Sequence, residues 1–436
     1  MKIGVLAQYL DTRNDIFEIL NILRVEHEIV IYVRQTDLGK IRITIPSSIT
    51  IVPICTFSTL SKLYLLLWQY IYLVFGRIPA SSYNYYMTEN VKLQNPHMRK
   101  LQKIAQSTLV WLSKKSPHLI SYDYYLSRLA FIKSPPRIHS DIDVFLCFTE
   151  IYHDWMFAQI LEQKKPVWTY VYSWDHPCKM KTFSKKTKYL VWNAGIEKDL
   201  IELQNINPEQ IYVWGASQFA EVHRFLNRKN HYPEVNSFAF PYIYLGCATG
   251  YDTLAEQEID TCIQMALQLE TVLPTWKLIV RPYPFLKNQA LYQKLSGSRN
   301  VVIDQNTYCE KQEITNDKFF KILHSKAFFH FGTTMGYEAG YFKTPSFLID
   351  LNDRKSALHN FVHQYQNDKY LNGDGNNVIK SYSELISVLS AISESHPDKV
   401  FSNHKLQQTM TLQSFEQLAR QLIHFMQDED HKELQS

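Results

Sequence analysis

The feature that most constrains the fold is a series of short, uninterrupted apolar runs that alternate with longer amphipathic segments. The run at 144–148 reads VFLCF, and the run at 242–247 reads YIYLGC. Runs of this length and composition are typical of parallel strands that are buried on both faces. Because the segments between them have the length and spacing of helices, the sequence predicts an α/β fold of doubly wound parallel sheets.

The alternation occurs twice, and each cycle predicts one Rossmann-like sheet. In the first cycle we expect strands at 3–7, 28–33, 49–54, 144–148, 167–172, 189–192 and 211–214, with helices at 15–24, 155–163 and 197–204. In the second we expect strands at 242–247, 277–281, 301–303 and from 328, with helices at 253–270, 317–325, 383–392 and 412–427. The order Thr253-x-x-Glu256 predicts a capping box at the first helix of the second cycle.

A break in this rhythm separates the two cycles. The segment 221–241 is rich in basic, polar and proline residues, and a chain of 436 residues is too long for one ordinary core. We therefore expect a domain at 1–222, a linker at 223–241, a second domain at 242–410 and a final helix and tail at 411–436. Two such domains would face each other across a cleft and bind ligands at the carboxyl ends of their strands.

Charge, cysteines and missing motifs argue against several classes of protein. The net charge is only +4, whereas nucleic-acid binding predicts a stronger, clustered basic signal. The six cysteines form no CxxC pair, and no metal-ligand cluster is visible in the spacing of His, Asp and Glu. The D-x-D order at 141–143 precedes its strand, which is the wrong edge of a sheet for a metal. Neither GxxxxGK[ST] nor GxGxxG is present. The first residues lack the pattern of a signal peptide, so we expect a cytoplasmic protein.

The segment 60–78 (LSKLYLLLWQYIYLVFGRI) is strongly apolar and aromatic. Its uncharged centre is too short to span a bilayer comfortably. We favour a core helix of the first domain over a helix that docks at a membrane interface, and peripheral contact with the inner membrane stays open as the alternative.

The stretch 328–351 (FFHFGTTMGYEAGYFKTPSFLIDL) carries the clearest functional signal. An apolar strand leads into a loop of small residues, Gly332, Thr333 and Thr334. Such a loop, opening a helix, presents unpaired backbone N–H groups that suit a phosphate or pyrophosphate. Glu338 follows about one helical turn later, where its carboxylate can accept hydrogen bonds from a ribose. The other interpretation is a generic strand–loop–helix turn in which a threonine caps the helix.

Two cations follow the strand at 277–281. Arg281 ends the strand and Lys287 lies further along the loop, so both belong to the carboxyl edge of the sheet. Arginine offers a phosphate a planar fork and lysine a point charge. Prolines on both sides of Tyr283 restrict the loop, which favours a positioned Arg281 over an ordinary surface arginine.

Three polar blocks follow strands of the first cycle. They read Ser173-Trp174-Asp175-His176, Val191-Trp192-Asn193 and Gly215-Ala216-Ser217-Gln218-Phe219. Asp175 and His176 come just after a buried strand, where a carboxylate or imidazole can take a proton from an acceptor hydroxyl. The residues leave open a second interpretation, in which Asp175 caps a turn and His176 has no role.

These motifs resemble those of GT-B glycosyltransferases. The order strand, phosphate loop, helix and acid resembles their donor-nucleotide site, and the blocks around Asp175 resemble enzymes that build bacterial capsule and lipopolysaccharide, with His176 in place of the usual asparagine. The resemblance implies that Arg281 offsets charge on a leaving diphosphate. One retaining group carries two glutamates in this motif, and His330 stands at the first position, so inversion or retention stays open. Because His330 ends a strand at the phosphate loop, it is also a candidate for contact with the nucleotide.

The resemblance implies a metal-independent glycosyltransferase that moves a sugar from a nucleotide-sugar donor to a glycan or a lipid-linked acceptor. It also implies that the domain at 242–410 binds the donor and the domain at 1–222 binds the acceptor. The nucleotide-sugar is a substrate, and no cofactor is expected. A cytoplasmic enzyme, with peripheral contact at the inner face of the membrane, is the expected setting. Three alternatives share the architecture: a CDP-glycerol or ribitol-type polyol-phosphate transferase, a sugar-nucleotide 2-epimerase, and a non-catalytic scaffold in a polysaccharide assembly complex.

Overall fold

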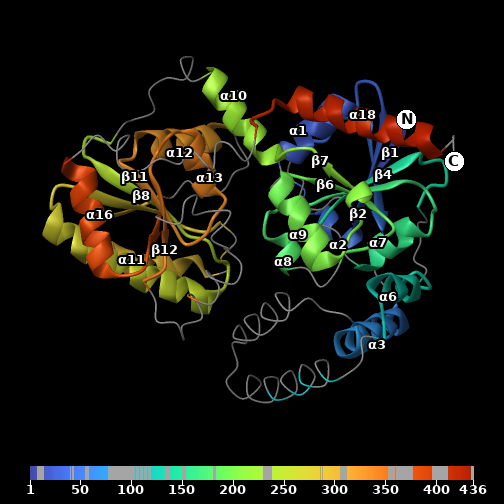
Figure 1. The fold of residues 1–436 in the computed structure, drawn as a ribbon, viewed down its shortest axis with the longest axis horizontal. Helices are drawn as coiled ribbons and strands as arrows, with labels where there is room; N and C mark the ends of the chain where they lie inside the picture. Colours follow the sequence, from blue (N-terminus) through green and yellow to red (C-terminus); the bar gives the residue numbers. More distant parts are fainter. Residues whose placement is uncertain are drawn as a thin grey trace. The chain divides into compact units, whose positions relative to one another are not determined.

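The structure is a computed structural model of the chain. It describes residues 1–6, 14–39, 41, 44–54, 58–76, 104, 108, 111, 115, 119–132, 138–149, 154–179, 183–228, 238–284, 286, 288–304, 312–351, 359, 377–394 and 411–433. The chain divides into two compact units (Figure 1). Unit 1 takes its described residues from Met1–Tyr83, Asn95–Glu221 and Leu412–Ser436, and unit 2 takes them from Val222–Thr411.

Unit 1 is built around a parallel sheet of seven strands in the order β3-β2-β1-β4-β5-β6-β7. The strands are β1 (Lys2–Leu6), β2 (Glu28–Arg34), β3 (Ile49–Ile54), β4 (Val144–Phe148), β5 (Val167–Tyr170), β6 (Lys188–Val191) and β7 (Ile211–Val213). Strand β1 pairs with β2 on one side and with β4 on the other. The direction of winding therefore reverses between β1 and β4, which makes their carboxyl ends a topological switch point.

Helices connect these strands and cover the sheet. They are α1 (Asn14–Leu23), α2 (Gln35–Leu38), α3 (Thr59–Phe75), α6 (Tyr122–Leu129), α7 (Asp154–Leu161), α8 (His176–Lys179), α9 (Ala194–Gln204), α18 (Phe415–Glu433) and the short 3-10 helices η3 (Pro208–Gln210) and η4 (Ser217–Phe219). Helix α10 (Ala220–Arg228) follows η4, and its residues from Val222 onward belong to unit 2. In helix α9 an asparagine at each end sets where the helix begins and ends. Its N-cap Asn193 accepts a hydrogen bond from the Ile196 N–H, and Asn205 ends it in the left-handed region at φ 55°.

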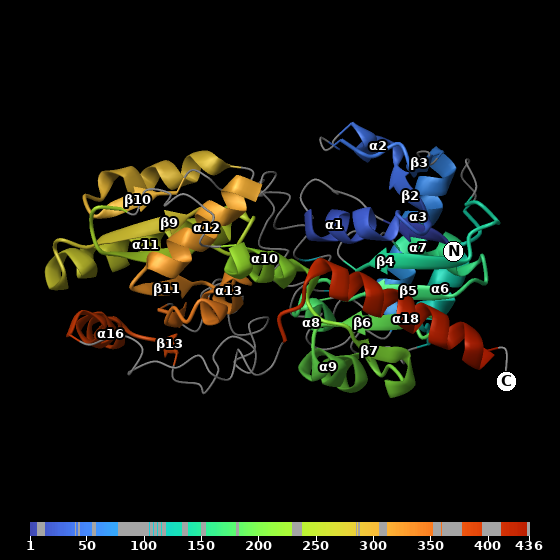
Figure 2. The ribbon, with the colours of Figure 1, turned by 90° about the horizontal axis from the view of Figure 1, so that it is seen from above.

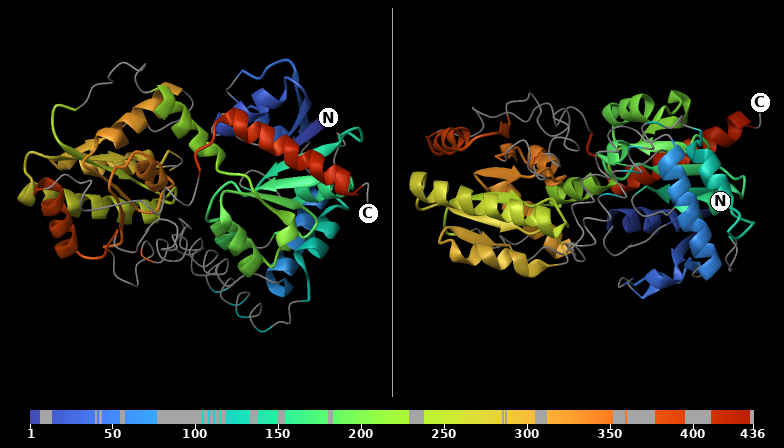
Figure 3. Two further views of the ribbon diagram at one scale, coloured as in Figure 1. Left: turned by 45° about the horizontal axis from the view of Figure 1, so that its top comes forward. Right: turned by 90° about the horizontal axis from the view of Figure 1, so that it is seen from below.

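The last helix, α18, belongs to unit 1. It packs against α1, as Figure 3 shows. The Trp214 indole N–H donates to the Leu418 carbonyl at 2.9 Å, and the Trp168 and Phe425 rings stack. The segment expected as a separate helix and tail therefore returns to the first sheet.

Helix α3 has a buried face and an exposed apolar face. Tyr72 is fully buried, and its ring stacks on Tyr125 of α6 at 4.6 Å. On the other face, Leu60, Leu63 and Leu67 are between 55% and 78% exposed. The expectation of a core helix therefore holds for one face alone, where Tyr64, Leu65 and Trp68 pack partly buried beside Tyr72, and an apolar stripe is left at the surface. Within the described ranges, no helix has the length and hydropathy needed to cross a membrane.

Unit 2 is built around a parallel sheet of six strands in the order β10-β9-β8-β11-β12-β13. The strands are β8 (Tyr242–Gly246), β9 (Lys277–Arg281), β10 (Val301–Ile303), β11 (Ala327–His330), β12 (Ser346–Ile349) and β13 (Val378–Ile379). The connecting helices are α11 (Asp252–Val272), η6 (Gln289–Gly297), α12 (Gln312–His324), α13 (Met335–Tyr341) and α16 (Tyr382–Glu394). Here the switch point lies between β8 and β11, which are neighbours.

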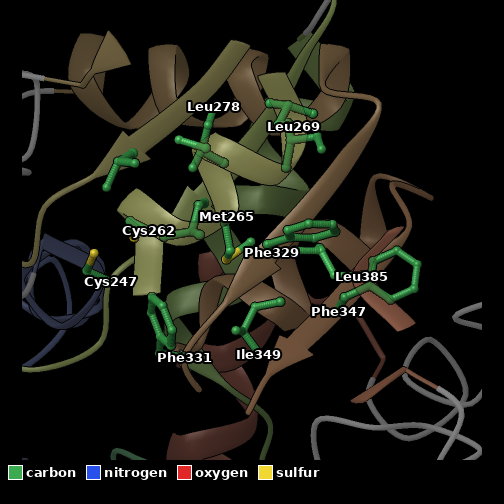
Figure 4. Close-up of a cluster of buried hydrophobic side chains, with 14 of the residues drawn as sticks. Cys247, Cys262, Met265, Leu269, Leu278, Phe329, Phe331, Phe347, Ile349 and Leu385 are labelled. Atoms are coloured by element: carbon green, nitrogen blue, oxygen red, sulfur yellow. The ribbon is translucent and has the colours of Figure 1, made fainter. Parts of the chain in front are cut away.

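Alternate side chains of each strand in unit 2 point to opposite faces of the sheet. One face forms an apolar core with α11 and α16, and Figure 4 shows Phe329 and Phe347 of the sheet near Met265 and Leu385 of those helices. Burying each large apolar side chain contributes about 1.5–3 kcal/mol. The opposite face packs against α12 and α13, which lie side by side (Figure 2). The fully buried, continuous apolar strands follow from this two-sided cover.

The predicted fold class is confirmed, since both halves contain parallel α/β sheets. Two local expectations differ from the structure. Part of the segment expected as a linker forms α10, whose Phe225 packs against Phe319, Phe320 and Phe342 at 4.9–5.6 Å between ring centroids. Helix α11 begins one residue before Thr253, with Tyr251 at its N-cap and no side-chain cap, so the predicted capping box was wrong.

Candidate functional site

The loop after β11 leaves two backbone donors unused at the switch point of unit 2. Gly332 has φ 97°, a conformation that favours glycine, and its N–H donates to the His330 Nδ1 at 3.0 Å. The Thr333 hydroxyl accepts from the Met335 N–H at 3.3 Å. In the part of the chain that the structure describes, the N–H groups of Thr333 and Thr334 donate to no acceptor. Both residues are half-buried, and N–H groups that begin a helix can bind an anion, so these two amides are candidates for a ligand contact.

The His330 side chain fixes the conformation of this loop through its hydrogen bond with the Gly332 N–H. Its side chain is fully buried, and burial lowers its pKa to about 3, so the ring is neutral at ordinary pH. Because Nδ1 accepts from Gly332, the ring proton belongs on Nε2. That nitrogen faces Gly336, where an added Cβ would lie only 2.9 Å away, so the close contact requires glycine. His330 is therefore buried between Gly332 and Gly336, and its contacts with them set the conformation of the loop.

Glu338 lies on α13, one turn after the loop. Its Oε1 accepts from the Lys318 Nζ of α12 at 2.7 Å, and both side chains are about nine-tenths buried. Its Oε2 is buried and has no hydrogen-bond partner among the described residues. A buried carboxylate oxygen without a donor is costly, of order 1–3 kcal/mol.

Arg281 ends β9 and is held in a buried network. Its guanidinium donates to the Asp304 carboxylate at 3.0 Å and to the Tyr244 hydroxyl at 3.3 Å. Lys321 contacts the other oxygen of Asp304 at 2.8 Å. Burial opposes the charge of Asp304, but the nearby Arg281 and Lys321 hold the pKa of its carboxyl below the usual range. Arg281 is thus a positioned cation, and its charge is partly compensated within the protein.

The remaining sequence candidates for binding and metal fall elsewhere. Lys287 lies outside the described residues. Asp141 and Asp143 lie at the entrance of β4, where they bind the Lys2 side chain and backbone N–H at 2.8 and 2.7 Å. Over the described ranges, no group of three His, Cys, Asp or Glu side chains is arranged to hold a metal ion.

Two acidic residues at the edge of unit 2 were missed from sequence. Glu258 of α11 is fully buried and accepts from the Ala248 N–H at 3.1 Å, which fixes the loop after β8, while burial raises the pKa of its carboxyl. Asp350 follows β12 and bonds to the His359 Nδ1 at 2.8 Å. A glutamate on the apolar face of an amphipathic helix is the signal that would have found Glu258.

The catalytic candidates of the sequence, Asp175 and His176, lie at the carboxyl edge of unit 1. Both are buried, and Asp175 accepts from the Ser173 hydroxyl at 2.6 Å. The His176 Nδ1 bonds to the Thr149 hydroxyl at 2.5 Å. The same hydroxyl accepts from the Tyr172 N–H at 3.2 Å, so Thr149 ties the ends of β4 and β5 to α8.

A second carboxylate at this edge was missed from sequence. Asp15, in the first turn of α1, accepts from the Tyr172 hydroxyl at 3.1 Å and from the Ser217 hydroxyl at 2.5 Å. Ser217 belongs to the block at 215–219 that was noted for its resemblance, but nothing local pairs it with a residue 202 positions earlier. The structure therefore brings together the ends of β1, β5 and β7.

No protein-family model matches the sequence, and no curated protein sequence matches it. Similar solved structures include the UDP-N-acetylglucosamine 2-epimerase from Rickettsia bellii, with TM-score 0.52, 8% identity and coverage of 98% of this chain and 96% of that one. The putative UDP-N-acetylglucosamine 2-epimerase from Listeria monocytogenes has TM-score 0.51, 11% identity and coverage of 99% and 97%. The Methanocaldococcus jannaschii enzyme in complex with UDP-GlcNAc and UDP has TM-score 0.50, 12% identity and coverage of 98% and 99%. These likenesses extend over nearly the whole chain, and what they establish is a shared two-sheet fold, that of the GT-B enzymes.

Proposed function

We propose that the protein is a glycosyltransferase whose unit 2 binds a nucleotide-activated sugar at the β8–β11 edge. The observation that carries this proposal is the pairing of two unused amides, at Thr333 and Thr334, with an unsatisfied carboxylate oxygen on Glu338. Backbone N–H groups suit the diphosphate, and the carboxylate suits the ribose hydroxyls. Thr334 and Glu338 are four residues apart, about 6 Å along a helix, which is a suitable spacing for a phosphate and its ribose.

Charge compensation at the leaving diphosphate is assigned to Arg281. Sugar transfer from a nucleotide donor depends on positioning and on stabilising charge that grows on the leaving group. Asp304 and Tyr244 hold the guanidinium in place, so its position needs no reorganisation during reaction. The nucleotide-sugar is a substrate in this proposal, and neither a metal nor a cofactor is invoked.

The acceptor is assigned to unit 1, where His176 is the candidate proton acceptor. The bond between its Nδ1 and Thr149 fixes the ring, and Asp175 is the adjacent carboxylate. The acceptor class is a glycan or a lipid-linked saccharide. With the latter, the exposed apolar stripe of α3 provides the surface for peripheral contact with the inner face of the membrane.

A ligand screen tests the proposal. Thermal stability is measured with UDP-, GDP-, CMP- and CDP-linked donors, and release of the nucleotide is measured in parallel. We expect stabilisation by a sugar nucleotide. Stabilisation by CDP-glycerol alone identifies a polyol-phosphate transferase, and no response to any nucleotide identifies a scaffold. The epimerase alternative predicts inversion of the sugar at C2 without release of the nucleotide.

A pair of variants tests the amides directly. Thr334 has φ −54°, which proline adopts readily, so Thr334→Pro removes one N–H that donates to none of the residues described in the structure. Thr334→Ala retains the N–H and is the matched control. We expect nucleotide affinity to fall about tenfold in Thr334→Pro and to stay unchanged in Thr334→Ala. Equal nucleotide affinity in both folded variants contradicts the assignment.

A further inference from the structure

The contact between Lys318 and Glu338 joins two helices that the chain places on either side of β11. Lys318 lies on α12 before the strand, and Glu338 lies on α13 after it. The Nζ and Oε1 atoms are 2.7 Å apart, with side-chain exposures of 11% and 9%. Neither residue contributes to the apolar core of the unit. A pair buried to this degree fixes both side chains more firmly than a surface pair.

The two oxygens of Glu338 are in different situations. Oε1 accepts from Lys318, whereas the buried Oε2 accepts no hydrogen bond from the described residues. A lysine is a compact point charge, and its bond to one oxygen leaves the other for a different donor. An arginine would occupy both oxygens with its fork. With lysine at position 318, Oε2 of Glu338 therefore stays available to a different donor.

We propose that Lys318 is a positioning residue for the ribose contact of Glu338, and this rests on the proposed function. Lys318 holds the carboxylate by Oε1, so that Oε2 accepts from the hydroxyl groups of the nucleotide's ribose. Its expected contribution is discrimination between nucleotides with and without those hydroxyls. A role limited to stability predicts instead that the fold weakens while discrimination survives.

The test compares the affinities of UDP and 2′,3′-dideoxy-UDP, measured by calorimetry on the full chain. We expect the wild-type protein to bind UDP at least about tenfold more tightly, since hydrogen bonds to a carboxylate are strong. Lys318→Met is expected to lose most of this ratio while its affinity for dideoxy-UDP stays within about twofold of wild type. Lys318→Arg is expected to restore the pairing with Glu338 but to retain less of the ratio, because its fork competes for Oε2.

A double variant covers the case in which Lys318→Met unfolds because Glu338 loses its partner. The double variant Lys318→Met with Glu338→Gln removes the buried charge at both of these positions. We expect its ratio of UDP affinity to dideoxy-UDP affinity to equal that of Glu338→Gln alone. A further loss in the double variant, or a wild-type ratio in folded Lys318→Met, overturns the inference. If wild-type protein binds no UDP, GDP or CDP, the proposed function fails as a whole. If it binds a nucleotide with no preference for the hydroxyls, the ribose role of Glu338 fails and Lys318 with it.

Discussion

The carboxyl edges of the two sheets have the same topology and different chemistry. In each unit the strand order reverses direction after the first strand and its outer neighbours. The reversal lies between β1 and β4 in unit 1 and between β8 and β11 in unit 2. In unit 2, Arg281, Lys318 and Lys321 contact the carboxylates of Asp304 and Glu338, and the loop after β11 carries two amides that donate to no acceptor among the described residues. At the edge of unit 1, the described contacts join hydroxyl groups, carboxylates and an imidazole.

The scaffold sets where a ligand binds, and the side chains set which ligand it is. A parallel sheet with a switch point offers a crevice in either unit. Cations and free N–H groups suit an anionic diphosphate, and a buried imidazole with carboxylates suits a hydroxyl group that gives up a proton. That contrast supports the proposed assignment of donor to unit 2 and acceptor to unit 1.

The largest change in stability is expected from the buried charge network of unit 2, formed by Arg281, Asp304 and Lys321. Asp304→Ala leaves Arg281 and Lys321 without their shared partner, so we expect unit 2 to lose about 3–5 kcal/mol of stability. Hydrogen exchange in β8 to β12, read in urea, measures this loss unit by unit. Lys198→Ala is the control, since it removes an exposed pair worth about 0.5 kcal/mol or less. A loss of stability as small as that of the control would mean that Asp304 does not stabilise unit 2 through Arg281 and Lys321.

The next effect concerns the donor. Glu338→Ala is expected to slow nucleotide release from the donor by about 100-fold, because it removes the charged acceptor for the ribose hydroxyls. Glu256→Ala on α11 of the same unit, where the glutamate makes only an exposed pair with Lys294, is the control and should be active. Thermal melting of both variants separates lost chemistry from lost folding. A wild-type rate in Glu338→Ala would remove the donor site from unit 2.

A smaller effect is expected in unit 1. Ser217→Ala removes a donor to the buried Asp15 carboxylate, which should cost about 1–3 kcal/mol. The loss should appear in hydrogen exchange of β1, β5 and β7 and leave unit 2 unchanged. Ser387→Ala, whose hydroxyl bonds only to its own helix on an exposed face, is the control, with an expected change within about 0.5 kcal/mol. Equal changes in both variants would show that Ser217 does not organise this edge.

The smallest effect, taken per pH unit, is a pH dependence that belongs to unit 2. His330 has an ordinary pKa of 6.5 that folding lowers to about 3, so between these values the unfolded chain binds a proton that the folded protein does not. Its contribution is complete above pH 6.5 and decreases by about 1.4 kcal/mol for each pH unit below that. His330→Asn should therefore flatten the acid limb of the stability profile, measured by urea unfolding between pH 4 and 8. An unchanged slope would mean that His330 is protonated in the folded state.

The sequence predicted the strands better than the contacts between them. The strands at 144–148, 277–281 and 301–303 were predicted with the bounds that the structure has. The continuous apolar run at 144–148 reports burial on both faces, whereas the edge strand at 301–303 is only half-buried. Helix α10 was missed because its outer face has the polar composition of a linker, and only the contacts of Phe225 reveal its packing. Local pattern identifies a strand without identifying its neighbours.

The candidate site was predictable in its residue types and not in its pairing. The loop at 332–334 and Glu338 were visible because they are close in sequence. Lys318 and Asp15 were not, since their partners are 20 and 202 residues away and are chosen by tertiary packing. His330 was assigned to a ligand from its position at a strand end, and its burial beneath Gly332 gives it a role in shaping the loop.

The central claim is that the unused amides of unit 2 receive the nucleotide's phosphates. Selective 15N labelling of threonine, with titration by UDP-, GDP- and CDP-linked donors, reports the amides of both units in one NMR measurement. We expect large, saturable shifts of the Thr333 and Thr334 signals and a much smaller change at Thr149 of unit 1. Saturable nucleotide binding that shifts Thr149 and leaves Thr333 and Thr334 unmoved would contradict it.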